Sequence, residues 1–228
     1  MKVVILAGGK GVRLGEKYKK IPKPFVKINN YSIAENLINL FNSYGYKDFI
    51  ICCDHRNNIA KKLVQKSILE NNNLKFINTG RNSNTLLRIY KIKKYLDNND
   101  FFLCYGDGLA NLNINKLKKN HIQNKKHITM TCYPYTPDKG IIKITNKRHK
   151  FYEKVLMRNY WVNIGFFIIT KKILNKIKNK NISFEETLLK NCILKDKVNF
   201  YKFKGKWQCL DTQKDIEKIK KLKAEKLL

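Results

Sequence analysis

Residues 1–25 read MKVVILAGGKGVRLGEKYKKIPKPF, and this stretch decides the fold. Residues 2–7 form an apolar, β-branched run that is typical of a strand buried on both faces. The run passes directly into Gly8, Gly9 and Gly11, whose missing Cβ atoms let a ligand approach the backbone closely. A strand that ends in a glycine turn at the start of an α/β sheet is where such sheets bind nucleotides. The stretch therefore predicts a nucleotide site beside the first strand.

Two cations follow the glycines. Arg13 comes just after the turn, and Lys23 lies between two prolines that stiffen its loop. Together they predict a site that handles more than one phosphate. The spacing matches neither the dinucleotide fingerprint G-x-G-x-x-G nor a P-loop, because no Gly-Lys-Ser/Thr follows. A generic turn is the plainer alternative, and the joint occurrence of strand, glycines, Arg13 and Pro-Lys-Pro disfavours it.

Strands and helices alternate along the first half of the chain. The patterns predict strands over residues 49–53, 74–77 and 100–105, and helices over residues 32–44, 57–69 and 86–96. Such alternation, with short turns, predicts a parallel sheet with right-handed crossovers.

The second half is expected to change character. Strands are predicted over residues 128–133, 140–144, 150–155, 161–169 and 198–203, and helices over residues 171–178, 184–192 and 214–226. We interpret residues 1–228 as a single α/β domain. About residues 1–112 would form a nucleotide-binding half and about residues 113–228 an acceptor-binding half.

The formal net charge of +31 ordinarily indicates a polyanionic partner. The lysines, however, are spread over the whole chain, and only residues 214–226 form a dense basic run, which we interpret as a solvated helix face. The clustered basic patch with interleaved aromatic residues that a nucleic-acid-binding protein would show is not found. The charge does predict attraction for anionic substrates, screened by salt.

The composition also indicates the cellular compartment in which we expect the protein. The six cysteines have no C-x-x-C spacing, so we expect buried free thiols rather than zinc or disulfides. A membrane-spanning stretch and a signal peptide are both missing from the pattern, and we expect a cytoplasmic protein. The four histidines, which have no patterned neighbours, are interpreted as surface residues: His55, His121, His127 and His149.

Two aspartates are candidates for a metal site. Asp107 stands between two glycines just past a predicted strand, where a carboxylate suits a hard cation. A turn aspartate is an equally good interpretation, because Asp-Gly is a common turn pair. A magnesium site needs a second carboxylate, and Asp211 is the best candidate. Its own alternative is an N-cap of the terminal helix.

The opening LAGGKGVRL (residues 6–14), followed by PKP (residues 22–24), resembles the signature of the sugar-nucleotide pyrophosphorylases, or NDP-sugar nucleotidyltransferases. YGDGLANLNI (105–114) and GKWQCLDT (205–212) look like the segments that supply the two metal aspartates in the glucose-1-phosphate cytidylyltransferases. Thr79-Gly80 with TLLR (85–88) resembles their nucleotide-base loop. FYEK (151–154) and WVNIGFF (161–167) look like their acceptor-site strands. The matches follow the family order over nearly the whole chain.

The resemblance implies the nucleotidyltransferase (glycosyltransferase-A-like) fold, a Rossmann-like mixed sheet flanked by helices. It also implies Mg²⁺-dependent transfer of CMP from CTP to a sugar 1-phosphate, with release of pyrophosphate. An ionised phosphate attacks directly, so positioning and electrostatics suffice.

The same resemblance implies the roles of individual residues. Asp107 and Asp211 would hold Mg²⁺, and Lys23 would stabilise charge on the α-phosphate. Arg13 would bind the β- and γ-phosphates with its planar fork. The remaining expected contacts are, for the nucleotide, Leu6, Ala7, Gly8, Gly9, Gly11, Thr79, Gly80, Thr85 and Arg88, and for the acceptor, Glu153, Lys154 and Asn163.

Some positions depart from the family pattern. Val155 follows Lys154 where the family usually has proline, and Ile164 follows Asn163 where it has glycine. These two leave open a non-sugar acceptor, such as a phosphorylated amine, amino acid or alcohol. Leu86-Leu87, where the cytidylyltransferases typically have two glycines, leaves the base preference open. An inactive nucleotide-binding regulator would be expected to have lost a cation or an aspartate of the site, and none is lost.

The partners expected are therefore a nucleoside triphosphate and a small phosphorylated acceptor, with no specific nucleic acid and no membrane. A homo-oligomer is left open. The resemblance alone implies a pathway of capsule or surface-polysaccharide biosynthesis.

Overall fold

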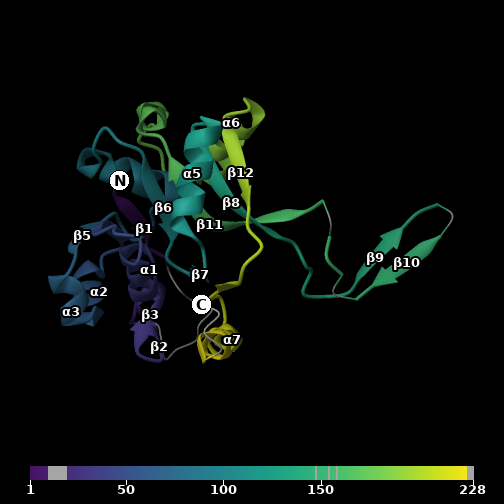
Figure 1. Ribbon diagram of the computed structural model, residues 1–228, viewed down its shortest axis with the longest axis horizontal. Coiled ribbons are helices and arrows are strands. Elements are labelled where there is room, and N and C mark those ends of the chain that lie inside the picture. The colour runs from purple at the N-terminus through teal and green to yellow at the C-terminus, as the bar shows by residue number, and fades with distance from the viewer. Residues whose placement is uncertain (10–19, 147, 154, 158, 225–228) are drawn as a thin grey trace.

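The computed structural model describes residues 1–9, 20–146, 148–153, 155–157 and 159–224 (Figure 1). Within these residues a seven-stranded sheet has the order β12-β8-β11-β6-β1-β4-β5. Its strands are β1 (Val3–Leu6), β4 (Asp48–Cys53), β5 (Asn73–Asn78), β6 (Phe101–Tyr105), β8 (Ile128–Pro134), β11 (Trp161–Ile169) and β12 (Val198–Lys202). Strands β5, β4, β1 and β6 are parallel, as predicted, whereas β11 runs antiparallel to both β6 and β8. The mixed α/β sheet expected from the sequence is confirmed.

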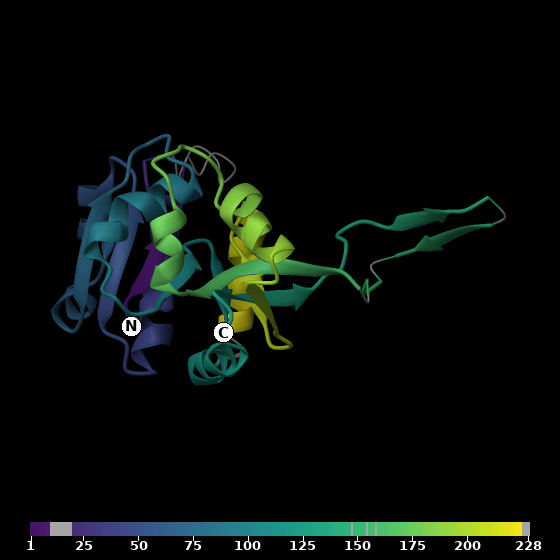
Figure 2. The same ribbon diagram turned by 90° about the horizontal axis from the view of Figure 1, so that it is seen from above.

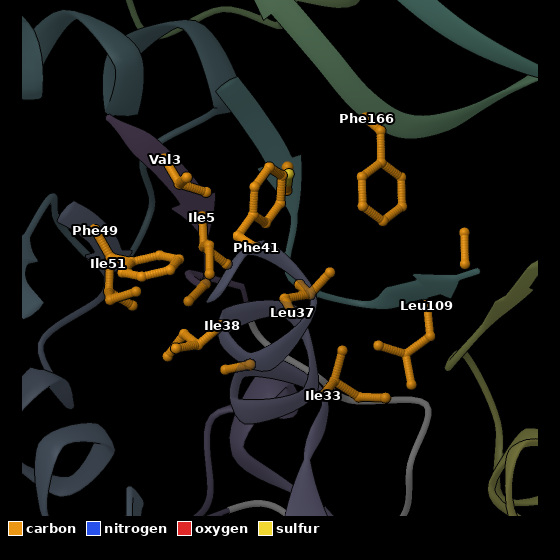
Figure 3. Close-up of a cluster of buried hydrophobic side chains, with 14 of the residues drawn as sticks. Val3, Ile5, Ile33, Leu37, Ile38, Phe41, Phe49, Ile51, Leu109 and Phe166 are labelled. Atoms are coloured by element: carbon orange, nitrogen blue, oxygen red, sulfur yellow. The ribbon is translucent and has the colours of Figure 1, made fainter. Parts of the chain in front are cut away.

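Strand β1 lies in the interior of the sheet, and its side chains contribute to the hydrophobic clusters on both faces. Val3 and Ile5 belong to one hydrophobic cluster, and Val4 and Leu6 belong to the other, because side chains alternate across a strand. Figure 3 shows Val3 and Ile5 on the side of Leu37 and Phe41 of α1 (Ile33–Asn42). Burial on both faces explains why the β1 sequence is continuously apolar rather than alternating.

The predicted helix over residues 57–69 is wrong in one respect, because it is broken into α2 (Asn57–Leu63) and α3 (Lys66–Glu70). The cause lies in α1, where buried Glu35 forms a capping box with Ser32. The second carboxylate oxygen of Glu35 accepts a hydrogen bond from the backbone N–H of Gln65 at 2.8 Å. Gln65 is thereby held in an extended conformation between the two helices.

The remaining helical segments are α4 (Thr85–Ile92), η4 (Lys93–Tyr95), α5 (Ile114–Asn124), η5 (Lys171–Lys176), η6 (Glu185–Leu189), α6 (Lys190–Leu194) and α7 (Gln213–Ala224). Helix α5 was not predicted, because only Ile114, Leu117 and His121 of its polar sequence are buried. His121 was expected at the surface, and that expectation is wrong. Its Nδ1 lies 2.7 Å from Thr129 Oγ1 on β8, and burial lowers its pKa.

Two predicted strands form an arm outside the sheet. β9 (Ile141–Ile144) and β10 (His149–Tyr152) pair in an antiparallel hairpin that projects from the rest of the molecule in both views (Figures 1 and 2). Ile142, Ile144 and Phe151 are exposed on it. Two further ladders lie nearer the sheet: β2 (Lys27–Ile28) with β3 (Tyr31–Ser32), and β7 (Gly108–Ala110) with β13 (Trp207–Cys209).

Helix α7 has a solvated basic face, as predicted, with Lys218 and Lys221 exposed. Its opposite face buries Ile216 and Ile219 in the same cluster as Val3. All six cysteines are free thiols; five are buried, and Cys209 is half-buried. In the part of the chain that the structure describes, none of the helices has the length and apolar character needed to cross a membrane.

Candidate active site

The candidate site lies where β1 and β6 end side by side. Leu6 and Tyr105 are partners in the parallel register, and the N–H of Gly106 donates to the Leu6 carbonyl at 3.0 Å. On the other side of β1, the N–H of Ala7 donates to the Cys52 carbonyl at 2.9 Å. Gly8 and Asp107 therefore leave the sheet at the same edge. The sheet extends on both sides of this point, with β4 beside β1 and β11 beside β6. Ligands of open α/β sheets bind at such an edge.

The Pro-Lys-Pro loop reaches this edge because Gly106 makes room for it. Residues 23–25 form a 3₁₀ turn in which Pro24 and Phe25 are buried. A Cβ atom on Gly106 would lie 2.8 Å from both the Leu6 carbonyl oxygen and Pro24 Cγ. Contacts that short do not occur without displacement, so glycine at 106 is what allows Lys23 to come beside Asp107.

A short ladder brings the last part of the chain to the same place. Cys209 on β13 is paired with Gly108 on β7, and the N–H of Leu210 donates to the Asp107 carbonyl at 2.7 Å. Asp211 follows directly. The ladder therefore aligns the two predicted metal aspartates, which stand far apart in sequence.

Asp215 holds the Asp211 segment in place. Its carboxylate accepts hydrogen bonds from the backbone N–H groups of Asp211, at 3.0 Å, and Thr212, at 2.8 Å. Burial acts to raise the pKa of Asp215, but these hydrogen bonds outweigh it and the pKa is lowered. Asp211 lies just before Thr212 and α7, and its backbone is held by these contacts. Asp211 is left to face Lys23.

Lys23 lies between the two aspartates. Its Nζ is 3.1 Å from Asp107 Oδ2 and 2.9 Å from Asp211 Oδ1. The Lys23 side chain is 14% exposed, whereas those of Asp107 and Asp211 are 38% and 37% exposed. Burial acts to lower the pKa of the ammonium, but the charges of Asp107 and Asp211 outweigh it and the pKa is raised. The carboxylates thus converge on one cation and have the oxygen chemistry that Mg²⁺ prefers.

Gly8, Thr79 and Arg88 are also brought together, as predicted. A Cβ atom on Gly8 would lie only 2.0 Å from Arg88 Nη1, so the guanidinium packs directly on the glycine turn. Arg88 Nη1 donates to Thr79 Oγ1 at 2.6 Å and to the Cys53 carbonyl at 3.3 Å. Burial lowers the pKa of Arg88. Arg88 is therefore buried against the backbone of the glycine turn rather than exposed to solvent.

The predicted base loop packs against a segment that the sequence did not single out. Thr85 Oγ1 donates to Glu185 Oε2 at 2.8 Å, and the hydroxyl of Tyr105 donates to Glu185 Oε1. Ser183 Oγ donates to Glu185 Oε2 at 2.7 Å. Burial acts to raise the pKa of Glu185, and these donors lower it below its ordinary value. Glu185 therefore links the base loop to the strand that leads to Asp107.

A second missed pair stands at the end of β4. Asp54 is buried, and Arg56 Nη2 lies 2.5 Å from its Oδ2. The same Nη2 donates to the Gly9 carbonyl at 2.9 Å. A signal existed for this pair, because β4 was predicted to end one residue before Asp54, at the edge where the site forms. For Glu185, by contrast, the sequence offered only a place near the start of the predicted helix over residues 184–192.

The predicted acceptor residues are not all gathered at the site. Asn163 Oδ1 accepts a hydrogen bond from the N–H of Gly165 at 2.9 Å. Gly165 has φ +78°, and a Cβ there would lie 2.7 Å from Tyr105 Cβ, so a glycine is required. Glu153 is exposed just after β10 in the arm, next to Gly140. Gly11, Arg13 and Lys154 lie outside the described residues.

Two of the residues that depart from the family pattern are packing residues, whereas Val155 is exposed. Ile164 is 3% exposed and belongs to the cluster that contains Leu109 and Phe166. Leu86 is buried in the first turn of α4, in the cluster on the opposite face of the sheet. Neither side chain is exposed at the site.

Comparison with known proteins identifies the family. The family model for nucleotidyl transferases matches residues 2–225. The chain belongs to the nucleotidyl transferase family.

Relatives and solved structures agree with this. The chain is 28% identical to the probable glucose-1-phosphate cytidylyltransferase of Bacillus subtilis, covering 97% of this chain and 96% of the relative. It is 28% identical to the glucose-1-phosphate cytidylyltransferase of Salmonella typhimurium, covering 94% and 93%. The fold is similar to a putative glucose-1-phosphate thymidylyltransferase of Bacillus anthracis, with a TM-score of 0.77, 14% identity, and coverage of 97% and 94%. The nucleotidyltransferase fold expected from the sequence is confirmed.

Proposed function

We propose that the protein is a magnesium-dependent cytidylyltransferase that transfers CMP from CTP to a sugar 1-phosphate and releases pyrophosphate. The observation that carries the proposal is the convergence of Lys23, Asp107 and Asp211 at the end of β1 and β6. The two cytidylyltransferase relatives, similar over nearly their whole length, support CTP and a sugar phosphate as substrates.

The reaction requires no nucleophile from the protein. An oxygen of the acceptor phosphate forms a new bond to the α-phosphorus, the bond from the α-phosphorus to the bridging oxygen breaks, and pyrophosphate leaves with that electron pair. The acceptor phosphate is already ionised at neutral pH, so no proton has to be removed. The protein supplies position and charge.

Asp107 and Asp211 would hold Mg²⁺, which supplies charge neutralisation between the reacting phosphates when it is bound. Lys23 forms ion pairs with both carboxylates. In the reaction we assign its ammonium to the oxygens of the α-phosphate, where negative charge grows as the new bond forms. Arg13 stays a proposal for the β- and γ-phosphates.

The nucleotide would lie over the glycine turn. Gly8 and Gly9 follow β1 with their backbone held by Arg88 below Gly8 and by Arg56 at the Gly9 carbonyl. Thr79 and Gly80 follow β5, which is separated from β1 by β4, and Gly80 has φ +100°, which favours glycine. Backbone groups held in this way can read the edge of a base, and we propose cytosine.

A sugar 1-phosphate is the acceptor that the structure favours over a non-sugar phosphate. The case for a non-sugar acceptor rested partly on the bulk of Ile164, and that side chain is buried in the core. Asn163 stays beside Tyr105 and the site, where its amide can meet a sugar hydroxyl. Glu153 and Lys154 remain predictions for acceptor binding.

The experiment is a pyrophosphate-release assay with Mg²⁺. CTP, UTP, GTP and dTTP are each paired with glucose 1-phosphate, other sugar 1-phosphates and non-sugar phosphates. The expected result is turnover with CTP and a sugar 1-phosphate, which is slower in Asp107→Asn at a limiting Mg²⁺ concentration and disappears in the wild type when EDTA removes the metal. Turnover only with another nucleotide would overturn CTP, and turnover only with a non-sugar phosphate would overturn the acceptor.

A further inference from the structure

The proposed mechanism leaves one potential metal ligand of the site unused. Cys209 is the last residue of β13, and it is half-buried where the five other cysteines are buried. Its thiol donates a hydrogen bond to Asp211 Oδ2, with Sγ 3.3 Å from that oxygen. The thiol thus points at a carboxylate that the proposed function assigns to magnesium.

The position of this sulfur is fixed by the backbone. The ladder pairs Cys209 with Gly108, the residue after Asp107. Residues two apart on an extended segment share a face, so Cys209 and Asp211 point to the same side. One ligand atom each from Asp107, Cys209 and Asp211 lie within 4.8 Å of one another. Three donors therefore converge on one space.

The ammonium group of Lys23 lies next to these donors. Lys23 Nζ is within hydrogen-bonding distance of Asp107 and Asp211, on the carboxylates that flank the thiol. The observation is independent of the sulfur, and it indicates that the two carboxylates are placed to share a positive charge. A divalent ion would displace this ammonium and then add the third donor.

The chemistry of three mixed donors differs from that of two carboxylates. Mg²⁺ takes oxygen ligands and has little affinity for sulfur. Zn²⁺ and ions that behave like it bind cysteine sulfur and carboxylate oxygen together, often with three protein ligands and one open position. The thiol therefore adds nothing to magnesium binding but much to the binding of a thiophilic ion.

We propose that Asp107, Cys209 and Asp211 form a mixed oxygen–sulfur site for a thiophilic divalent cation such as Zn²⁺, Co²⁺ or Cd²⁺. The proposal rests on the proposed function in one respect, because the same two carboxylates would serve magnesium during turnover. The thiophilic ion competes with Mg²⁺, releases the thiol proton to solvent when it binds, and inhibits the transferase.

The direct test is a Cd²⁺ titration of the nucleotide-free protein, followed by the near-ultraviolet charge-transfer absorption of a cadmium–thiolate bond. The expected result is one tight Cd²⁺ per chain with this absorption, weakened competitively by excess Mg²⁺. In Cys209→Ser we expect the absorption to vanish and Cd²⁺ affinity to fall by about tenfold or more, because even outer-shell changes have effects of that size.

Two further variants sharpen the test. Cys192→Ser is the matched control, since Cys192 lies on α6 and belongs to the hydrophobic cluster on the other face of the sheet. It should titrate like the wild type. Asp107→Asn keeps the thiol and should still weaken Cd²⁺ binding, which keeps the proposal testable if Cys209→Ser does not fold. Unchanged Cd²⁺ binding in either site variant, or no competition by Mg²⁺, would overturn the proposal.

A second readout separates this proposal from the proposed function. In the pyrophosphate-release assay, the Zn²⁺ concentration that halves turnover should rise about tenfold or more in Cys209→Ser relative to the wild type. An enzyme without turnover on any substrate pair would overturn the proposed function and leave the Cd²⁺ titration readable. Turnover that Zn²⁺ inhibits equally in both proteins would overturn the thiol site alone.

Discussion

Lys23 Nζ lies 2.9 Å from Asp211 Oδ1, across a sequence separation of 188 positions. This ion pair joins the loop after the first strand to the segment before the last helix. It is half-shielded from solvent, so its attraction is screened less by salt than that of a surface pair. Under the proposed function, Mg²⁺ would compete with the Lys23 ammonium for the carboxylates of Asp107 and Asp211.

The first prediction concerns Lys23. Replacing it with alanine removes the cation that we assign to the α-phosphate, and turnover should fall by about 100- to 1,000-fold. Initial rates of pyrophosphate release measure the effect. Lys27→Ala is the matched control, because Lys27 is exposed on β2 and should leave the rate unchanged. A Lys23→Ala protein with the wild-type rate would contradict the assignment.

The second prediction concerns the response to metal. Asp107→Asn removes one of the two carboxylates, so the Mg²⁺ concentration needed for half-maximal turnover should rise by about tenfold or more. The measurement is a series of rates at increasing Mg²⁺ with fixed CTP and acceptor. Asp138→Asn in the exposed arm is the control. If Asp107→Asn had the metal dependence of the wild type, Asp107 would be only a turn residue.

The third prediction concerns Gly8 and Arg88. A methyl group on Gly8 would collide with the Arg88 guanidinium, so Gly8→Ala should lower the free energy of unfolding by about 1 to 3 kcal/mol. Gly9→Ala is the matched control, because a Cβ there meets nothing within 4 Å among the residues that the structure describes.

Urea denaturation of Gly8→Ala, Arg88→Ala and the double variant Gly8→Ala/Arg88→Ala tests whether the collision causes the loss of stability. Removing the guanidinium removes the collision, so the double variant should lose less stability than the sum of the single losses, by about 0.5 kcal/mol or more. Additive losses would show that the collision with Arg88 is not what makes glycine necessary.

The fourth prediction concerns pH. The pKa of Asp215 is lowered in the folded protein, so its contribution to stability is present above the unfolded value near about 3.9 and is lost as pH falls through the lowered folded value. Asp215→Asn should therefore cost about 1 kcal/mol at neutral pH. The difference from the wild type should shrink as the pH falls below about 4.

Urea denaturation across the acid range measures this difference. Glu217→Gln is the control on the same helix, because Glu217 is exposed and pairs only with nearby Lys220 among the contacts described. It should be near neutral at every pH. A stability difference for Asp215→Asn that persisted unchanged into acid would refute the role of the charged carboxylate.

Much of the fold and the centre of the site could be predicted from the sequence. β1 and the glycine turn carry a local signal, since a fully apolar run followed by glycines has few other uses. Asp107 and Asp211 could be placed because each follows an apolar segment in a pattern that resembles the family. The strand ends then gather these residues at one edge, which follows from parallel pairing alone.

The remaining features could not be predicted, because distant contacts determine them. The break between α2 and α3 is set by Glu35, which lies 30 positions before Gln65. His121 looked like a surface residue because the helix around it is polar, yet it faces Thr129 on β8. Cys209 was grouped with buried thiols, and only the ladder to β7 shows that it flanks the site.

The ladder between β7 and β13 also determines when Asp211 can join Asp107 during synthesis of the chain. A ribosome adds about 5 to 20 residues per second, and the strands β1, β4, β5 and β6 emerge long before the segment that carries Asp211. The early chain can pair those strands and present Lys23 and Asp107 at their edge. It has no second carboxylate until residues 207–211 arrive and β13 pairs with β7. The two carboxylates that we propose for metal binding thus come together only after β13 has docked on β7.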